Sequence, residues 1–276
     1  MQFRDLKKQY QVLKKDIDQA MVKVATDCNF ISGAQVADLE KELAEYVGVK
    51  HCVTCANGTD ALSIAMMTWG IGPGDAVFVP DFTFFSSGEI VSHCGATPVF
   101  VDVDEDTYNI SPESLETAVE KVLRDGKLKP HAVVAVDLFG LPAAFGQIRS
   151  AAEKYGLLIL EDGAQGFGGA IDGRKVCSFG DIATTSFFPA KPLGCYGDGG
   201  ALFTDNDELA DIMRSIRVHG KGAMKYDNIR IGLNSRLDTI QAAVLSVKLR
   251  AFREYELNDV NRAAARYTEL LSDKVK

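Results

Sequence analysis

The chain has 276 residues, of which 46% are hydrophobic and 25% charged, a composition typical of globular proteins that bury a large core. The formal net charge of -8 argues against a nucleic-acid-binding protein, and no basic block is interleaved with aromatic residues. The start of the chain, Met1-Gln2-Phe3-Arg4-Asp5, lacks the apolar core of a signal peptide, and no apolar run reaches membrane-spanning length. These features predict a soluble cytoplasmic protein that binds neither nucleic acid nor a membrane.

The amino-terminal part of the chain predicts two amphipathic helices. Residues 5–26 place apolar side chains at spacings of three and four, residues 29–33 interrupt the pattern, and a second helix follows with Val36, Leu39, Leu43 and Tyr46 on one face. After Gly48, short apolar runs alternate with helices through most of the chain. This alternation is typical of an α/β fold.

Short apolar runs predict the strands. They cover residues 52–56, 76–80, 97–104, 131–137, 157–162, 182–187 and 200–204. The runs at 131–137 and 157–162 are almost continuously apolar and end in acids, which favours a mostly parallel sheet with helices on each side. Ligands of such sheets bind beyond the carboxyl ends of the strands, so we expect Glu161 or Asp162 at the site.

The turn after the first strand is a candidate anion site. Asn57-Gly58-Thr59-Asp60 stands between the strand and a helix that continues from Ala61, and a helix start offers free N–H groups and a positive dipole end to an anion. The same residues would also fit an ordinary Thr or Asp helix cap. The next strand leads into an aromatic loop, residues 81–87, whose phenylalanines could be core or could form a stacking wall for a planar ligand.

Lys191 is the candidate nucleophile. Pro192 disfavours helical backbone at Lys191, and the glycines at 194, 197, 199 and 200 allow sharp bends or close approach. A buried lysine loses its proton more easily and can form an imine with a carbonyl compound. The alternative is a surface lysine in a loop.

From Arg236 to the end there is no glycine or proline, which predicts a long helix with Leu237, Ile240, Val244, Val247 and Ala251 on one face. We therefore divide the chain into a large domain with the amino-terminal helices, residues 1–235, and a helix over residues 236–276. Cys52 and Cys55 have CxxC spacing, but no second pair completes a zinc site. We expect reduced, mostly buried cysteines and no metal.

Taken together, the carboxyl ends of the predicted strands offer the inventory that pyridoxal 5'-phosphate requires. Its phosphate needs N–H and hydroxyl donors, its ring a stacking partner, its ring nitrogen a carboxylate and its aldehyde an amine. The candidates are Gly58 and Thr59 for the cradle, Phe84 for the stack, Asp162, Ser186 and Lys191.

Three stretches, residues 57–62, 161–165 and 186–201, resemble the DegT/DnrJ/EryC1/StrS sugar aminotransferases, a group within the fold-type I pyridoxal-phosphate enzymes. The resemblance covers essentially the whole chain. It implies an α/β fold, the large domain of fold-type I transferases, with a mostly parallel seven-stranded sheet and helices on both faces.

The resemblance also implies a role for each site residue. Lys191 would form the covalent link to the cofactor and later move the proton, and Asp162 would pair with the ring nitrogen. Gln165 would lie against the ring or its 3-hydroxyl, and Phe84 would stack on the ring. Gly58, Thr59 and Ser186 would hold the phosphate. Asn234 would reach the phosphate of the neighbouring subunit in a homodimer with shared active sites.

The implied activity is transfer of an amino group from glutamate to a UDP-linked keto sugar. The form of the Lys191 turn is closest to the branch that aminates UDP-2-acetamido-2-deoxy-3-oxo-glucuronate at C3 for surface polysaccharides such as the O-antigen. Two departures stand out. Gly163 replaces the alanine common after the aspartate, and family members continue beyond residue 276 into a small carboxyl-terminal domain that this chain is expected to lack, as a fragment or a truncated homologue.

Two other readings stay open from the sequence. One alternative is another enzyme of the same fold, a sugar dehydratase or a sulfur-transfer lyase. The related dehydratases carry histidine where Lys191 stands, so the lysine argues against them. A sulfur-transfer lyase would need a cysteine on a mobile loop, whereas Cys195 lies in the glycine-rich turn. A truncated homologue could also bind the cofactor and dimerise without turnover.

Overall fold

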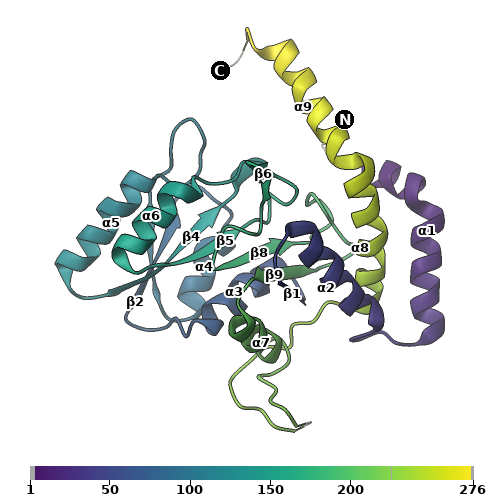
Figure 1. Ribbon diagram of the computed structural model, residues 1–276, viewed down its shortest axis with the longest axis horizontal. Coiled ribbons are helices and arrows are strands. Elements are labelled where there is room, and N and C mark those ends of the chain that lie inside the picture. Colours follow the sequence, from purple (N-terminus) through teal and green to yellow (C-terminus); the bar gives the residue numbers. More distant parts are fainter. Residues whose placement is uncertain (1–3, 225, 275–276) are drawn as a thin grey trace.

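The computed structural model describes residues 4–224 and 226–274, and a seven-stranded sheet forms its centre (Figure 1). The strand order is β1-β9-β8-β5-β4-β2-β3. All neighbours from β8 to β3 pair in parallel, while β9 is antiparallel to both β1 and β8. The seven strands are β1 (His51–Cys55), β2 (Asp75–Pro80), β3 (Thr97–Val101), β4 (Lys129–Val136), β5 (Leu158–Asp162), β8 (Ile182–Ser186) and β9 (Gly200–Thr204).

The mostly parallel, seven-stranded sheet expected from the sequence is thus confirmed. The strand expected over residues 97–104 is shorter, since β3 ends at Val101 and Val103 makes an isolated bridge with Ile110. A short hairpin, β6 (Ala170–Ile171) and β7 (Arg174–Lys175), lies outside the main sheet.

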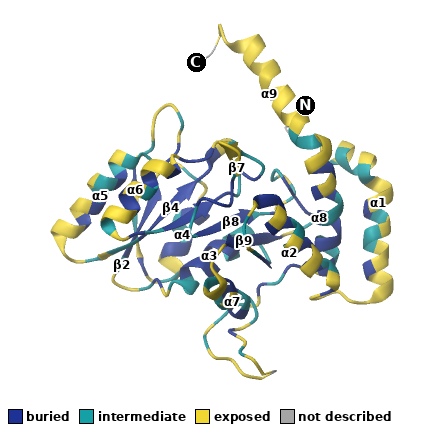
Figure 2. Ribbon diagram, in the orientation of Figure 1, coloured by how far each residue is buried: buried dark blue, intermediate teal, exposed yellow. Residues whose placement is uncertain are grey.

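Helices cover both faces of the sheet (Figures 1 and 2). Alternate side chains of each strand point to opposite faces, so Val53 packs with one set of helices and Cys52 with another. One face is covered by α3, α4 and α7, and the other by α2 and α8 at one end and α5 and α6 at the other. Their bounds are α2 (Ala34–Val47), α3 (Gly58–Thr68), α4 (Ser86–His93), α5 (Pro112–Asp125), α6 (Phe145–Tyr155), α7 (Asp207–Ile216) and α8 (Thr239–Ala251).

The expected single apolar face from Leu237 to Ala251 is wrong. Helix α8 packs against both α1 (Leu6–Asp27) and α2, so buried side chains surround much of it, including Lys248. After α8 the chain makes one π-helical segment, Phe252–Glu256, and continues as α9 (Leu257–Leu271). Helix α9 projects from the body, and it has no buried side chain among the residues that the structure describes (Figure 2).

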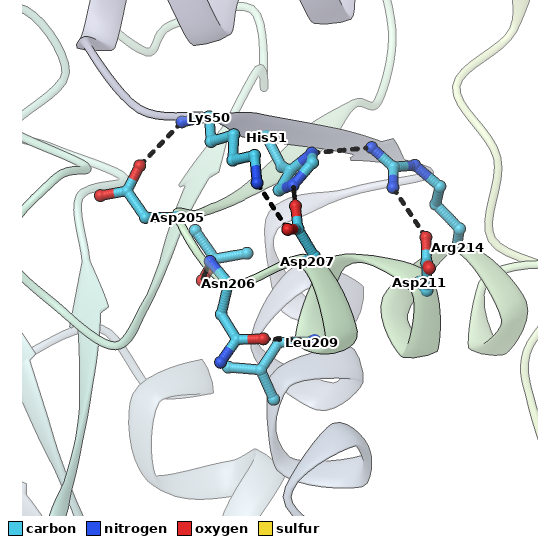
Figure 3. A network of polar contacts seen from close by, with 9 residues as sticks. Lys50, His51, Asp205, Asn206, Asp207, Leu209, Asp211 and Arg214 are labelled. Atoms are coloured by element: carbon cyan, nitrogen blue, oxygen red, sulfur yellow. Dashed lines mark hydrogen bonds and ion pairs between the residues drawn. The ribbon is translucent and has the colours of Figure 1, made fainter.

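A polar network joins the start of β1 to the start of α7 (Figure 3). Asp207 binds the Lys50 ammonium group, and its Oδ1 lies 2.6 Å from His51 Nε2. The Lys50 amide donates to Asp205 Oδ1 (2.8 Å), and an Arg214 nitrogen lies 3.4 Å from His51 Nδ1. This network fixes the end of β1 that is opposite the Asn57 turn.

Over residues 4–224 and 226–274, no helix is both long and apolar enough to cross a membrane. The same part of the chain contains no group of three or more His, Cys, Asp or Glu side chains that could hold a metal ion. The cysteines are free thiols, of which Cys28 is exposed and Cys94 half-buried.

Candidate active site

A cleft of about 1760 Å³ opens at the carboxyl ends of the parallel strands. Seven of the eight site residues predicted from the sequence line it: Gly58, Thr59, Phe84, Asp162, Gln165, Ser186 and Lys191. The remaining walls include part of α9, among them Val260 and Tyr267. The cleft therefore collects residues from five separate strand ends and loops at one edge of the sheet.

Asp162 is the buried acid of this cleft. It ends β5 in the middle of the sheet, in register with Val136 and Thr184, and is 6% exposed. The Ser87 hydroxyl donates to Oδ2 (2.9 Å) and the Ala164 amide to Oδ1 (3.2 Å). Burial raises the pKa of Asp162, whereas these two donors and the positive charge of Lys191 lower it. Burial outweighs these contacts, so the net effect is a raised pKa. The positive charge near this carboxylate does not fully compensate its burial.

Glu161 does not reach the cleft, because successive side chains of a strand point to opposite faces. Its carboxylate accepts hydrogen bonds from the amides of Cys177, Phe179 (2.6 Å) and Gly180 (2.9 Å). Of the two acids that the sequence offered, Asp162 lines the cleft and Glu161 does not.

Lys191 lies in a non-helical bend, as Pro192 predicts. Its amide donates to the carbonyl of Phe188 (2.8 Å), which closes the turn. Burial lowers the pKa of Lys191, and the nearby charge of Asp162 partly offsets this effect. The amine therefore loses its proton more readily than an exposed lysine and faces a buried carboxylate.

The start of α3 forms the anion cradle. Helix α3 begins at Gly58, and its cap is Asn57, whose side chain accepts from the Asp60 amide (2.8 Å); the Thr or Asp cap considered from the sequence is not formed. A Cβ on Gly58 would lie 2.7 Å from the Cβ of Ser186, so glycine is needed for this close approach. The helix start and the Ser186 side chain therefore meet at one spot.

Ser86 and Ser87 are site residues that sequence reasoning missed. The Ser86 hydroxyl lies 2.9 Å from that of Thr59 and lines the cleft, and Ser87 binds Asp162. Both are the last residues of the expected aromatic loop and the first residues of α4. Their position at a helix start was the available signal.

Phe84 and Gln165 both form part of the cleft wall. Phe84 is 66% exposed and Phe85 is 75% exposed, so the aromatic loop is not part of the core. Gln165 Oε1 accepts from the amide of Phe139 (3.0 Å), a residue with a positive φ of 56°. Gln165 thereby stabilises the loop after β4, which borders the cleft.

Asn234 lies outside the cleft, exposed at the base of a long excursion between α7 and α8. Its Oδ1 accepts from Arg236 Nη2 (2.6 Å), and its backbone forms an isolated antiparallel β-bridge with Val218. The neighbouring Ser235 donates to Asp60 Oδ2 (2.6 Å) and accepts from the Ala56 amide (3.1 Å). The base of the excursion is therefore fastened to the start of α3.

The sequence is similar to known proteins over nearly its whole length. The model of the DegT/DnrJ/EryC1/StrS aminotransferase family matches residues 11–276. The UDP-2-acetamido-2-deoxy-3-oxo-D-glucuronate aminotransferase of Pseudomonas aeruginosa is 46% identical over 267 residues, which cover 97% of this chain and 72% of that protein.

Solved structures give the same result. A DegT DnrJ EryC1 StrS aminotransferase from Brucella abortus superposes with a TM-score of 0.97 at 53% identity, covering 99% of this chain and 73% of that one. NtdA from Bacillus subtilis, solved with bound cofactor PMP, gives a TM-score of 0.86 at 30% identity over 95% of this chain and 58% of that one. The chain therefore belongs to the DegT/DnrJ/EryC1/StrS aminotransferase family, whose members are pyridoxal-phosphate-dependent sugar aminotransferases.

Proposed function

We propose that this protein transfers the amino group of glutamate to the C3 keto carbon of a UDP-linked sugar, specifically UDP-2-acetamido-2-deoxy-3-oxo-D-glucuronate. The observation that carries the proposal is the placement of Lys191 and the buried Asp162 in one cleft with the start of α3. The 46% identity to the Pseudomonas aeruginosa enzyme supports the choice of substrate. The product would enter surface polysaccharide such as the O-antigen, and the reaction would take place in the cytoplasm.

The residues of the cleft fit pyridoxal phosphate. Asp162 is a buried carboxylate whose pKa is raised by burial, and a protonated ring nitrogen is the cation that would compensate it. The free amides of Gly58 and Thr59 at a helix start, together with the Ser186 hydroxyl, suit a phosphate. Phe84 and Gln165 would border the ring.

When bound, pyridoxal phosphate supplies an electron sink for the bonds around the donor's Cα. Asp162 would hold the proton on the ring nitrogen, which keeps that sink effective. Lys191 would take the proton from Cα of glutamate and pass it to C4' of the cofactor in the first half of the reaction. In the second half it would move a proton the opposite way, from C4' to C3 of the sugar. Its lowered pKa increases the neutral fraction of the amine, the form that can accept a proton.

In this proposal residues 1–235 form the cofactor-binding domain, and the helix from residue 236 leads along the cleft, since α9 lines part of it.

We further propose a homodimer with shared sites. The excursion over residues 217–224 and 226–236, which we call the arm, carries exposed Met224, Ile229 and Ile231. On the body, the exposed rings of Phe82, Tyr108 and Phe139 contact one another beside the cleft. Burial of these two apolar surfaces by a second copy would bring Asn234 to the partner's cleft.

The substrate is tested with purified protein, pyridoxal phosphate, glutamate and three UDP sugars. These are the 3-keto uronate, its 3-keto analogue with a hydroxymethyl group at C5, and a 4-keto sugar. We expect the 3-keto uronate to be aminated with the highest kcat/KM, with release of 2-oxoglutarate, and Lys191→Ala to be inactive. Amination of the 4-keto sugar in preference to both 3-keto sugars would overturn the assignment.

Shared sites are tested by mixing two impaired variants, Lys191→Ala and Asn234→Ala, through co-expression. In a heterodimer one site would carry both substitutions and the other none. Random pairing gives half heterodimers, so the mixture should recover about a quarter of wild-type activity. Activity no higher than the mean of the two homodimers would contradict the shared site.

A further inference from the structure

We propose that Arg4 and Lys248 are positioning residues that hold the turn carrying Lys191, and thereby favour covalent capture of the cofactor aldehyde by that lysine. The proposal rests on the proposed function in one respect, since it takes Lys191 as the attachment residue. Arg4 precedes α1 and Lys248 lies on α8, so both are remote in sequence from the turn.

Arg4 binds three successive backbone carbonyls of the turn. Its Nη1 donates to the carbonyls of Ala190 (2.9 Å) and Lys191, and its Nη2 donates to that of Pro192 (2.6 Å). A guanidinium presents its donors in a fixed planar fork, so a single side chain can hold several acceptors in one arrangement. The Arg4 side chain is half-buried, and this burial lowers its pKa.

Lys248, on α8, binds another carbonyl of the same turn. It is 2% exposed, and its ammonium group donates to the carbonyl of Gly194. Burial lowers the pKa of Lys248 to about 8. The buried ammonium group of Lys248 has a desolvation cost. Its hydrogen bond to the Gly194 carbonyl and its contact with the Tyr196 ring, whose centroid lies 5.4 Å away, offset part of this cost.

A counter-charge keeps both cations in place. The charge of Glu256, in the π-helical segment after α8, opposes the lowering of the pKa of Arg4 and of Lys248. Glu256 also accepts from Gln9 Nε2 of α1 (2.7 Å). The amino-terminal segment, α8 and the π-helical segment thus converge behind the Lys191 turn.

The consequence for Lys191 is restricted backbone motion. Charge-assisted hydrogen bonds engage the carbonyls of residues 190, 191, 192 and 194, while the amides of Lys191 and Cys195 close the turn internally. Rotating the Lys191 backbone would break several of these bonds together. The amine is therefore held near Asp162 before the cofactor arrives, which reduces the entropy lost when the covalent bond forms.

The test separates this role from a general effect on folding or binding. Arg4→Met and Lys248→Met are made in the wild-type and in the Lys191→Ala backgrounds, and pyridoxal-phosphate affinity is measured by equilibrium titration. In the wild-type background, borohydride trapping and mass spectrometry also give the covalently modified fraction. We expect each substitution to lower affinity about tenfold when Lys191 is present, the equivalent of one charge-assisted hydrogen bond. In the Lys191→Ala background affinity should change less than about twofold, because the remaining contacts are non-covalent.

Three further variants complete the design. Arg4→Lys should restore part of the covalent fraction, since a single ammonium group replaces part of the fork. Lys248→Gln keeps a donor for the Gly194 carbonyl and should trap more cofactor than Lys248→Met. Arg149→Met is the matched control, because Arg149 holds Asp181 (2.7 Å) and the Phe179 carbonyl outside the cleft; it should lower thermal stability without changing the trapped fraction.

Equal loss of affinity in both backgrounds would overturn the proposal, because the residues would then act on non-covalent binding or folding. Unchanged trapping in Arg4→Met and Lys248→Met would also overturn it. If wild-type protein itself shows no trapping on Lys191, the proposed function fails instead, so the two failures are distinguishable. Should a Met variant not fold, the ranking of Arg4→Lys and Lys248→Gln against wild type decides the question.

Discussion

Gly163→Ala tests how tightly the segment after Asp162 is packed. A Cβ at Gly163 would lie 2.7 Å from Cys177 Sγ, 2.8 Å from Val176 Cγ1 and 3.2 Å from the Thr184 carbonyl oxygen. These distances are well short of the ~3.5–4.0 Å of normal contact. All three neighbours are 1% exposed, so they cannot move into solvent. The φ of Gly163 is not positive, so the effect is steric rather than conformational.

Overpacking of this kind costs about 1–3 kcal/mol. At roughly 2–4 °C per kcal/mol for a chain of this size, the Tm should fall by about 2–12 °C. Thermal unfolding with and without pyridoxal phosphate measures the effect. Gly146→Ala is the control, because a Cβ there meets nothing within 4 Å on an exposed turn of α6; it should be neutral or stabilising.

Cys177→Ala removes Sγ, the atom closest to the methyl group that Gly163→Ala adds. In that background Gly163→Ala should cost about 1 kcal/mol less than in wild type. The residual cost would come from Val176 and the Thr184 carbonyl. A Gly163→Ala protein as stable as wild type, or an equal cost in both backgrounds, would refute the reasoning.

Three further predictions follow from the charges and contacts of the site. The pKa of Asp162 is raised above 3.8, so apoprotein stability should fall relative to Asp162→Asn as pH rises above that value, and pyridoxal phosphate should reverse the difference in Tm. The pKa of Lys248 is lowered from 10.5 to about 8, so wild type should gain stability relative to Lys248→Met as pH rises through this interval, measured by the difference in Tm. Gly58→Ala should lower cofactor affinity at least tenfold in a binding titration, since its Cβ would lie 2.7 Å from the Cβ of Ser186. Unchanged affinity would contradict the proposal that the start of α3 binds the phosphate.

The sequence predicted most of the fold because each strand is a separate apolar run bounded by turn residues. The bounds of β5 and β8 agree with the expected runs to within one residue. The direction of β9 could not be read from its five residues, because parallel and antiparallel strands share the same side-chain pattern. The burial of α8 on two sides could not be predicted either. A lysine such as Lys248 is expected at the surface of a helix unless its buried acceptor, here the Gly194 carbonyl, is known.

The candidate site was predictable where its residues form local motifs. Gly58, Asp162, Ser186 and Lys191 each lie at the end of a strand or in the segment after it, and the strands bring them to one edge of the sheet. Arg4 could not be found in this way, because its partners lie more than 180 residues along the chain and no local pattern links them.

The proposed function depends on Lys191 being the residue that binds the cofactor covalently. The most direct measurement is borohydride reduction of the protein with pyridoxal phosphate, followed by digestion and mass spectrometry of the labelled peptide. We expect one pyridoxyl group on Lys191, and no label at any position in Lys191→Ala. Labelling of a different lysine in wild type, or undiminished labelling of Lys191→Ala, would contradict it.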